Sequence, residues 1–259
     1  CRYSLAAGWL SNKPDTTDFG FQLNFMQATP PHYYGNVNPT LLEVVDPSAQ
    51  RVAEFGCGAG ALARAVRQRC AGNVHYVGVE LMASELAKAR KALDVALVRN
   101  LDQTPDWSED PELTAALVSG NFDHVIFGDV LEHLYDPERV LQQAVACLRP
   151  GRSALVCIPN VQHWSVLAQL IRGHWPQQDA GLFDRTHIRW FALTDMVQLL
   201  ERAGLVVEKV IPRVFKPENG QALLQALQPA AELLGVDPRQ FMQRSQPLQY
   251  VLVGRKPAS

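Results

Sequence analysis

From residue 51 onwards, short apolar runs alternate with longer segments of helical composition, and this alternation limits the possible folds more than any other feature. Strands that alternate with helices at this spacing predict a parallel sheet with helices on both faces, that is, a doubly wound α/β fold. Strands are expected at 51–55, 74–79, 96–98, 122–127 and 152–158, and helices at 61–69, 84–93, 137–148 and 194–203.

The end of the chain departs from this alternation. Residues 205–214 and 248–253 are both strand-like and enclose an amphipathic segment, 221–234. Because one face of that segment is apolar, it is expected to lie over the sheet.

The pattern also predicts how the chain is divided. Residues 1–35 show no sustained period and are expected to form an N-terminal arm or lid. Residues 36–259 then form one domain, with substrate-lid insertions at about 159–192 and 215–246.

Composition and charge exclude several classes of function. The chain has 259 residues with a formal net charge of −2, so no broad attraction to nucleic acid is expected. No apolar run approaches the length of about 18 residues that a membrane span needs, and no leader is evident, so we expect a soluble, cytoplasmic protein. Five cysteines without a Cys-x-x-Cys pair indicate reduced, buried thiols. Because the first residue is Cys1, a fused or associated biosynthetic domain is an expected partner; a homodimer is also considered.

A glycine loop between the first strand and the first helix is the main candidate binding site. An open α/β sheet binds ligands at this position, and glycines let the backbone turn sharply and let a ligand approach closely. Read loosely, the loop fits the fingerprint of dinucleotide-binding proteins, and Glu80 lies about twenty residues further on, where these proteins have an acid that binds the ribose. The loop residues assigned to a cofactor are Glu54, Gly56, Cys57, Gly58 and Gly60.

Glu54 distinguishes the two ligands. A pyrophosphate needs the positive end of the helix dipole, and a carboxylate two residues before the first glycine opposes its negative charge. The loop also has no Lys or Arg before Arg64. S-adenosylmethionine carries a sulfonium and an ammonium instead, so the loop favours this cofactor over a dinucleotide.

Residues that follow the second and third strands complete the expected cofactor site. Glu80 is expected to accept hydrogen bonds from both ribose hydroxyls, with Leu81 beside it. The alternative for Glu80 is a solvated acid at a helix N-terminus. Asn100 and Leu101 are expected at the adenine, one binding its exocyclic amine and the other covering the ring; the alternative for Asn100 is a plain turn residue.

Four motifs together make the chain resemble the class I S-adenosylmethionine-dependent methyltransferases. They are Glu54-x-Gly56-x-Gly58-x-Gly60, Glu80, the run from Phe122 to Leu134, and Leu148-Arg149-Pro150-Gly151. The runs from Ile158 to Trp164 and from Phe183 to Arg189 resemble the bacterial branch related to ubiquinone-pathway O-methyltransferases and the methyltransferase domains found beside glycosyltransferases.

The resemblance implies a fold and a cofactor. The fold is a Rossmann-like sheet of seven strands in the order 3-2-1-4-5-7-6, with strand 7 antiparallel. The cofactor is S-adenosyl-L-methionine, and the product is S-adenosyl-L-homocysteine. The chain departs from such domains at Asn100, where they often have Asp.

Three residues are candidates for catalysis. Methyl transfer requires the acceptor to be positioned and water excluded, and it needs a base only if the acceptor is protonated. Asp129 ends the fourth strand and is expected to face the methionine half of the cofactor. His133 is the first candidate for a general base on an acceptor hydroxyl, the alternative being a loop-fixing hydrogen bond. Asp184 and His187 form either a second acid–base pair or a structural pair that fixes the lid.

Aromatic and polar residues of the N-terminal arm and of the 159–192 lid are assigned to the acceptor. His163, Trp164 and Tyr33 suit a sugar or another polyol-like or aromatic molecule. Tyr34 is expected to close over the cofactor, the alternative for both tyrosines being a hydrophobic anchor. The histidine spacing matches no trusted ligand motif, so no metal is expected.

The sequence therefore predicts an S-adenosylmethionine-dependent methyltransferase that acts on a small molecule. The expected acceptor atom is an oxygen of a sugar, a glycan precursor or a secondary metabolite. An NAD-dependent oxidoreductase and a non-catalytic cofactor-binding module of a larger glycosyltransferase-like protein are the alternatives.

Overall fold

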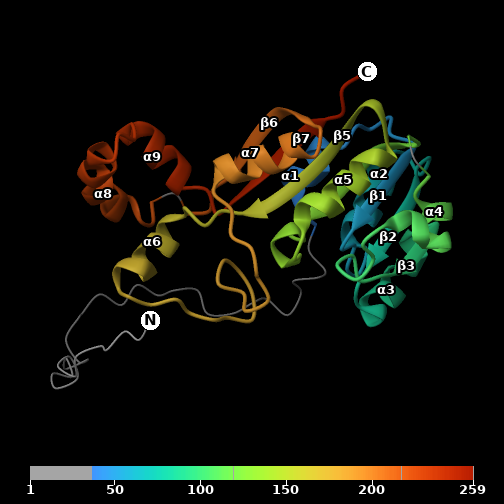
Figure 1. Ribbon diagram of the computed structural model, residues 1–259, viewed down its shortest axis with the longest axis horizontal. Helices are drawn as coiled ribbons and strands as arrows, with labels where there is room; N and C mark the ends of the chain where they lie inside the picture. The colour runs from blue at the N-terminus through green and yellow to red at the C-terminus, as the bar shows by residue number, and fades with distance from the viewer. Residues whose placement is uncertain (1–36, 119, 217, 259) are drawn as a thin grey trace, which may run out of the picture.

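A seven-stranded sheet forms the centre of the computed structural model, which describes residues 37–118, 120–216 and 218–258 (Figure 1). The strand order is β3-β2-β1-β4-β5-β7-β6, and β7 runs antiparallel to both of its neighbours, β5 and β6. The predicted fold class and strand order are confirmed. The strands are β1 (Arg51–Phe55), β2 (His75–Glu80), β3 (Val95–Val98), β4 (Phe122–Gly128), β5 (Leu148–Pro159), β6 (Val206–Arg213) and β7 (Gln249–Arg255).

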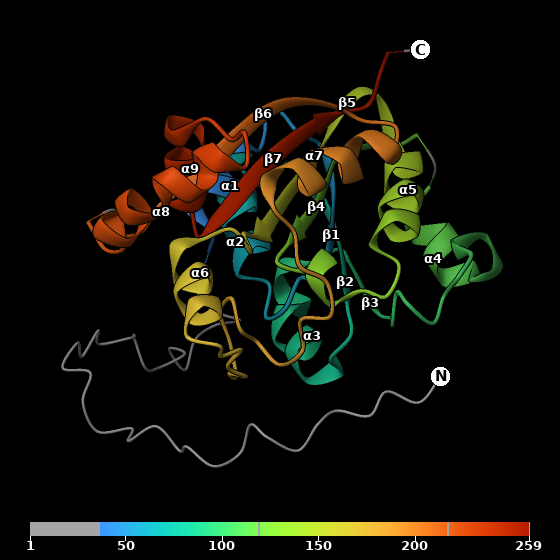
Figure 2. The same ribbon diagram turned by 60° about the vertical axis from the view of Figure 1, so that its left-hand side comes forward.

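Helices cover both faces of this sheet (Figure 2). Successive strand residues point to opposite faces, so Val52 packs in one hydrophobic cluster and Ala53 in the other. The first cluster includes residues of α1 and α2, and the second includes residues of α4, α5 and α7. The helices beside the sheet are α1 (Pro39–Val44), α2 (Ala61–Arg69), α3 (Ala83–Ala89), α4 (Pro111–Ala116), α5 (Pro137–Cys147) and α7 (Leu193–Arg202), with single 3-10 turns η2 (Arg90–Ala92), η3 (Trp107–Glu109) and η4 (Leu131–His133).

Three further helices lie together away from the sheet, on the side opposite α4 (Figures 1 and 2). They are α6 (Trp164–Ile171), α8 (Gln221–Leu233) and α9 (Pro238–Ser245). Their apolar side chains form a cluster of their own, with Leu224 and Phe241 at its centre and Trp164 packed against it. The prediction that segment 221–234 lies over the sheet was therefore wrong, because its apolar face packs against α6 and α9 instead.

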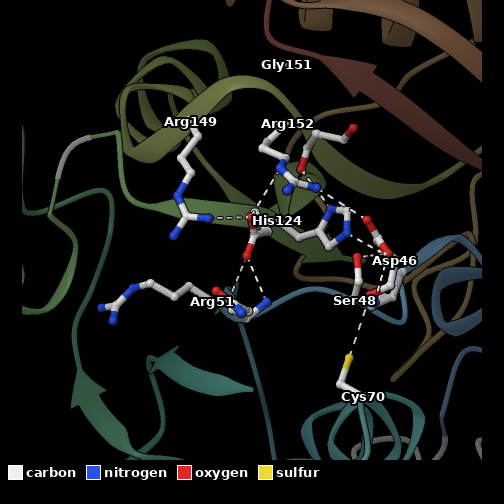
Figure 3. Close-up of polar contacts among 12 residues, drawn as sticks. Asp46, Ser48, Arg51, Cys70, His124, Arg149, Gly151 and Arg152 are labelled. Atoms are coloured by element: carbon white, nitrogen blue, oxygen red, sulfur yellow. Dashed lines mark hydrogen bonds and ion pairs between the residues drawn. The ribbon is translucent and has the colours of Figure 1, made fainter. Parts of the chain in front are cut away.

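The amino-terminal ends of β1, β4 and β5 are joined by a buried carboxylate. Asp123 is 1% exposed, and its Oδ2 accepts hydrogen bonds from the backbone N–H groups of Gln50 and Arg51 at 2.8 and 3.0 Å. Its Oδ1 lies 2.8 Å from Arg149 Nη1 and 3.2 Å from Arg152 Nε (Figure 3). We call this set of contacts the Asp123 brace.

His124 extends the brace towards the segment before β1. Its Nε2 accepts the backbone N–H of Asp46 at 3.0 Å, and Asp46 also pairs with Arg152 at 3.3 Å (Figure 3). These contacts hold together the amino-terminal edge of the sheet, which is opposite its carboxyl edge.

Two remaining predictions concern the cysteines and the membrane. Cys57, Cys70, Cys147 and Cys157 are buried and free, as predicted, whereas Cys1 lies outside the described residues. Within the described stretches, no helix is both long and apolar enough to cross a membrane. The predicted arm, residues 1–35, also lies outside the described residues.

Candidate active site

A cavity of about 740 Å³ lies at the carboxyl ends of the parallel strands. This is the edge at which doubly wound sheets bind ligands. Its walls come from the segments that follow β1, β2, β3 and β4, from α1, from residues 179–186, and from the ends of β6 and β7. Most of the predicted cofactor residues line it: Glu54, Gly56, Cys57, Gly58, Glu80, Leu81, Asn100, Leu101 and Asp129.

The glycine loop forms one wall because its backbone leaves no room for side chains. Gly56 has φ +71°, and a Cβ built there would lie 2.4 Å from Val130 Cγ2. Gly60 has a different role, since it does not line the cavity. It begins α2 at φ +75°, where a Cβ would lie 2.9 Å from that of Ala89, so Gly60 permits close packing between α2 and α3.

Glu54 is a buried carboxyl group at the end of β1. It is 5% exposed, and one oxygen accepts a hydrogen bond of 2.8 Å from the Tyr76 hydroxyl. Burial raises the pKa of Glu54 to about 8, the Tyr76 bond opposes this rise, and the charge of Glu80 adds to it. A cation in the cavity would therefore stabilise the ionised carboxylate.

Glu80 is held rigidly between two backbone donors. Its Oε2 accepts the N–H of Gly58 at 2.8 Å, and its Oε1 accepts the N–H of Met82 at 2.9 Å. The carboxylate thus fixes the glycine loop to the end of β2 and still borders the cavity. A carboxylate has about four acceptor positions, so capacity remains for ligand hydroxyls.

The segment after β3 closes the same end of the cavity. Asn100 Oδ1 accepts the backbone N–H of Asp102 at 3.0 Å, so this side chain makes the predicted turn contact and also lines the cavity. Leu101 is 6% exposed and lines the cavity beside it. Both alternatives for Asn100 are compatible with this position.

Asp129 lies immediately after β4 in an unusual backbone conformation. Its φ of +57° is in the left-handed region, which non-glycine residues rarely adopt. Its Oδ1 accepts a hydrogen bond of 2.6 Å from Gln249 Nε2, and the amide oxygen of Gln249 accepts one from Arg213. Burial raises the pKa of Asp129 to about 6, although the charge of Arg213 opposes the rise.

The predicted catalytic residues form a connected group. Thr186 Oγ1 donates to Asp184 Oδ1 at 2.6 Å and lies 3.1 Å from His133 Nδ1. His133 Nδ1 also lies 3.1 Å from the Thr186 carbonyl oxygen. Because a carbonyl only accepts, this contact assigns the ring proton to Nδ1 and leaves Nε2 as the basic nitrogen. His133, Asp184 and Thr186 line the cavity.

His187 lies behind His133. The two rings meet edge to face with centroids 4.7 Å apart, and His187 is 6% exposed. Burial and the charge of His133 lower the pKa of His187. Its Nε2 is 3.9 Å from Glu132 Oε1, and neither this nitrogen nor the Glu132 carboxyl oxygens have a hydrogen-bond partner among the described residues. Burial raises the pKa of Glu132 well above its usual range.

The predicted absence of metal is not tested by this arrangement. Within the described stretches, Glu132, His133 and His187 are the only His, Cys, Asp or Glu group whose potential ligand atoms converge, lying within 4.8 Å of one another. The sequence spacing conceals this convergence, because His187 is 54 residues from His133 along the chain.

Two predicted acceptor residues have structural contacts instead. His163 is 5% exposed and caps α6 through Ser165, and burial lowers its pKa to about 4. Trp164 packs against the α8–α9 cluster. Neither borders the cavity, so this geometry does not support acceptor contacts for them. Tyr33 and Tyr34 lie outside the described residues.

The sequence interpretation missed several polar residues of the cavity wall, among them Asn38, Arg213 and Gln249. Asn38 precedes α1, and its Oδ1 accepts two backbone N–H groups, from Thr40 and Leu41 at 3.1 and 3.2 Å. Its Nδ2 is buried without a hydrogen-bond partner. Arg213 and Gln249 occupy the ends of β6 and β7, and no local motif marks them.

Comparison with known proteins agrees with this geometry. A family model described as a methyltransferase domain matches residues 32–210. The ubiquinone biosynthesis O-methyltransferase of Aeromonas salmonicida is 24% identical over 193 residues, which are 71% of this chain and 77% of the relative. The enzyme of the same name from Chromobacterium violaceum is 31% identical over 188 residues, 70% of this chain and 77% of the relative.

A solved structure supports the fold. An S-adenosylmethionine-dependent methyltransferase from Archaeoglobus fulgidus superposes with a TM-score of 0.53 at 15% identity, covering 81% of this chain and 87% of that one. At this identity the likeness concerns architecture alone.

Proposed function

Because the chain belongs to the methyltransferase domain family, in the S-adenosylmethionine-dependent branch that includes ubiquinone-pathway O-methyltransferases, we propose that it methylates a hydroxyl oxygen of a small organic acceptor. The observation that carries the choice of oxygen is His133, whose basic Nε2 follows from the Nδ1 contact with Thr186 and whose ring borders the cavity. The named activity of the relatives also supports oxygen as the acceptor atom.

The cavity residues fit S-adenosylmethionine. The buried carboxyl of Glu54 suits the ammonium, because burial raises its pKa to about 8 and a neighbouring cation would favour its ionised form. Glu80 suits the ribose diol through its free acceptor positions. The unpartnered Nδ2 of Asn38 suits the methionine carboxylate as a hydrogen-bond donor. When bound, the cofactor supplies an electrophilic methyl group on a sulfonium.

The chain then has to hold the acceptor and move one proton. His133 Nε2 accepts the proton of the acceptor hydroxyl as the oxygen attacks the methyl carbon. Thr186 and Asp184 orient the imidazole, since the Thr186 hydroxyl is fixed by its bond to Asp184 Oδ1 at 2.6 Å. Asp184 is thus proposed as a positioning residue, and His187 as the packing partner of His133.

Calorimetry and turnover test this proposal. We expect the protein to bind S-adenosylhomocysteine in calorimetry. In turnover assays with S-adenosylmethionine and a panel of catechols and polyols, we expect it to form S-adenosylhomocysteine. His133→Asn should lower kcat at least tenfold and leave the affinity for S-adenosylhomocysteine unchanged. No binding at millimolar concentration would refute the proposal, as would His133→Asn turnover equal to that of the wild type. Enhanced NADH fluorescence would instead favour an oxidoreductase.

A further inference from the structure

Arg213 is a basic residue of the cavity that the proposed reaction does not use. It ends β6, where it is the register partner of Gln249, and Gln249 is in turn the partner of Pro159 at the end of β5. These pairings place Arg213 at the carboxyl edge of the sheet, beyond Asp129 as seen from the glycine loop. It therefore borders the part of the cavity remote from Glu54 and Glu80.

The charge of Arg213 is not neutralised by a direct ion pair. Of the described residues, two arginines line the cavity, Arg99 and Arg213. Arg99 is paired with Asp110 at 2.5 Å and with Glu112 at 2.6 Å. Arg213 has no carboxylate oxygen within 4.0 Å among the residues that the structure describes. Its charge influences the carboxyl group of Asp129, to which it is bridged through Gln249.

The side chain is nevertheless held in place. One guanidinium N–H donates to the amide oxygen of Gln249, and the guanidinium carbon lies 5.2 Å from the ring centroid of Phe215. Arg213 is half-buried, so its charge is partly removed from water. A guanidinium offers five N–H donors in a planar fork that matches a carboxylate. The Gln249 amide oxygen and the Cys157 thiol are its polar partners, so donors remain for a ligand.

We propose that Arg213, oriented by Gln249 and Phe215, binds a carboxylate or a similar anionic group of the molecule that occupies this half of the cavity. The inference rests on the proposed function. The carboxylate has two sources that share this chemistry: an acidic substituent of the acceptor, or the methionine carboxylate of the cofactor. Asn38 already offers a donor for the latter, so an acidic acceptor is the source that the cavity accommodates without competition.

The test compares Arg213→Met and Arg213→Lys with the wild type and with Arg255→Met. Arg255 is the matched control because it lies at the opposite end of β7, is 46% exposed in its side chain and pairs with Glu208. Arg213→Lys keeps the charge and loses the planar fork. Circular dichroism establishes that each variant is folded.

The first arm measures the cofactor as the source. Calorimetry compares S-adenosylhomocysteine with its decarboxylated analogue. If Arg213 binds the methionine carboxylate, Arg213→Met lowers the affinity for S-adenosylhomocysteine about 10- to 100-fold and leaves the affinity for the analogue unchanged. The reason is that a hydrogen-bonded charge pair is lost only with S-adenosylhomocysteine.

The second arm measures the acceptor as the source. The protein saturated with S-adenosylhomocysteine is titrated with 3,4-dihydroxybenzoate and caffeate, each against its methyl ester, and turnover of the same pairs is followed with S-adenosylmethionine. If Arg213 binds an acidic acceptor, the wild type favours the acids, Arg213→Met loses that preference about 10-fold or more, and Arg213→Lys keeps part of it.

One result overturns the inference. Suppose that Arg213→Met binds S-adenosylhomocysteine as tightly as the wild type, and that it binds and methylates each acid and each ester as the wild type does. Arg213 then binds no carboxylate. That result differs from failure of the proposed function, in which the wild type itself would bind no S-adenosylhomocysteine.

Discussion

Glu54 and Glu80 are two buried carboxyl groups on neighbouring strands, and their different partners lead to different predictions. Glu80 is fixed by the N–H groups of Gly58 and Met82, whereas Glu54 has a phenolic hydroxyl as its partner. Glu80 therefore fixes the glycine loop and borders the cavity at the same time. The protonation of Glu54 should instead depend on nearby charge.

Truncation of Glu80 should weaken cofactor binding strongly. Glu80→Ala removes the acceptor for two backbone donors and for the ribose hydroxyls, so we expect about 10- to 100-fold weaker S-adenosylhomocysteine binding by calorimetry. Glu80→Gln, which retains one acceptor oxygen, should lose less. The exposed acid Glu109 provides the control, and Glu109→Ala should bind normally. Unchanged affinity in Glu80→Ala would exclude a ribose contact.

Cofactor affinity should depend on pH through Glu54. The raised pKa means that Glu54 is mostly protonated in the free protein below pH 8, whereas a bound ammonium favours the ionised carboxylate. Binding then releases a proton, so affinity should rise as pH increases from about 6 towards 8 and level off above 8. Calorimetry in buffers of different ionisation enthalpy measures the released proton, and Glu54→Gln should release none. A pH-independent affinity in the wild type would contradict the assignment.

Among residues, those that share a local motif could be predicted from the sequence, and those that meet only through the fold could not. The glycine loop, Glu80 and Asp129 each follow a recognisable strand. Arg213 and Gln249 follow no motif, because they reach the cavity only through the antiparallel pairing of β6 and β7.

The elements themselves followed the sequence closely where their ends are chemically marked. Asp136 accepts the N–H of Arg139 at 3.0 Å and Pro137 follows it, so α5 begins where predicted. Segment 221–234 shows the limit of this reasoning. Its amphipathic pattern requires an apolar partner but does not specify which one, and the short helix α6, absent from the prediction, supplies it.

The contact between α6 and α8 should be sensitive to a single methyl group. A Cβ at Gly220 would lie 2.3 Å from the Trp164 ring, whereas one at Gly173 would meet nothing within 4 Å. Both glycines have left-handed φ, +78° and +70°, so Gly173→Ala serves as a matched control for backbone strain. We expect Gly173→Ala to lower the free energy of unfolding by about 1 kcal/mol and Gly220→Ala by about 2–4 kcal/mol in urea titrations. Equal losses of unfolding free energy in the two variants would show that α6 and α8 can move apart to accommodate the added methyl group.

The Asp123 brace should stabilise the sheet without contributing to binding. Asp123→Ala leaves two backbone N–H groups and two arginines without their buried acceptor, so we expect a loss of about 3 kcal/mol in the free energy of unfolding. Removal of the exposed Arg202–Glu138 pair by Arg202→Met should cost less than about 1 kcal/mol. Affinity for S-adenosylhomocysteine should not change in Asp123→Ala, because the brace lies at the far edge of the sheet; a large change would mean that the two edges are coupled.

At the scale of the whole molecule, the order of strands and the position of the cavity could be predicted, because the four motifs resemble those of a family with a known strand order. The part of the cavity beyond Asp129 could be predicted only in part. Asp184 was expected in a lid and lines the cavity, whereas Arg213 and Gln249 reach it only through the antiparallel pairing of β6 and β7.

Ligand binding should stabilise the entire fold, since the cavity joins both halves of the sheet. At a concentration one hundred times its Kd, S-adenosylhomocysteine should add about 2.7 kcal/mol to the free energy of unfolding and raise the Tm by roughly 5–10 °C. Scanning fluorimetry measures the shift, and NADH should produce none. A shift with NADH and none with S-adenosylhomocysteine would reverse the choice of cofactor.

The left-handed conformation of Asp129 has a cost in stability, because non-glycine residues rarely adopt it. Asp129→Gly would relieve that strain and remove a carboxyl group that burial disfavours, but it would also leave Gln249 Nε2 without its acceptor at the cavity wall. The strain at Asp129 is therefore held by the contacts of its side chain, which orient Gln249 and, through it, Arg213 at the cavity wall.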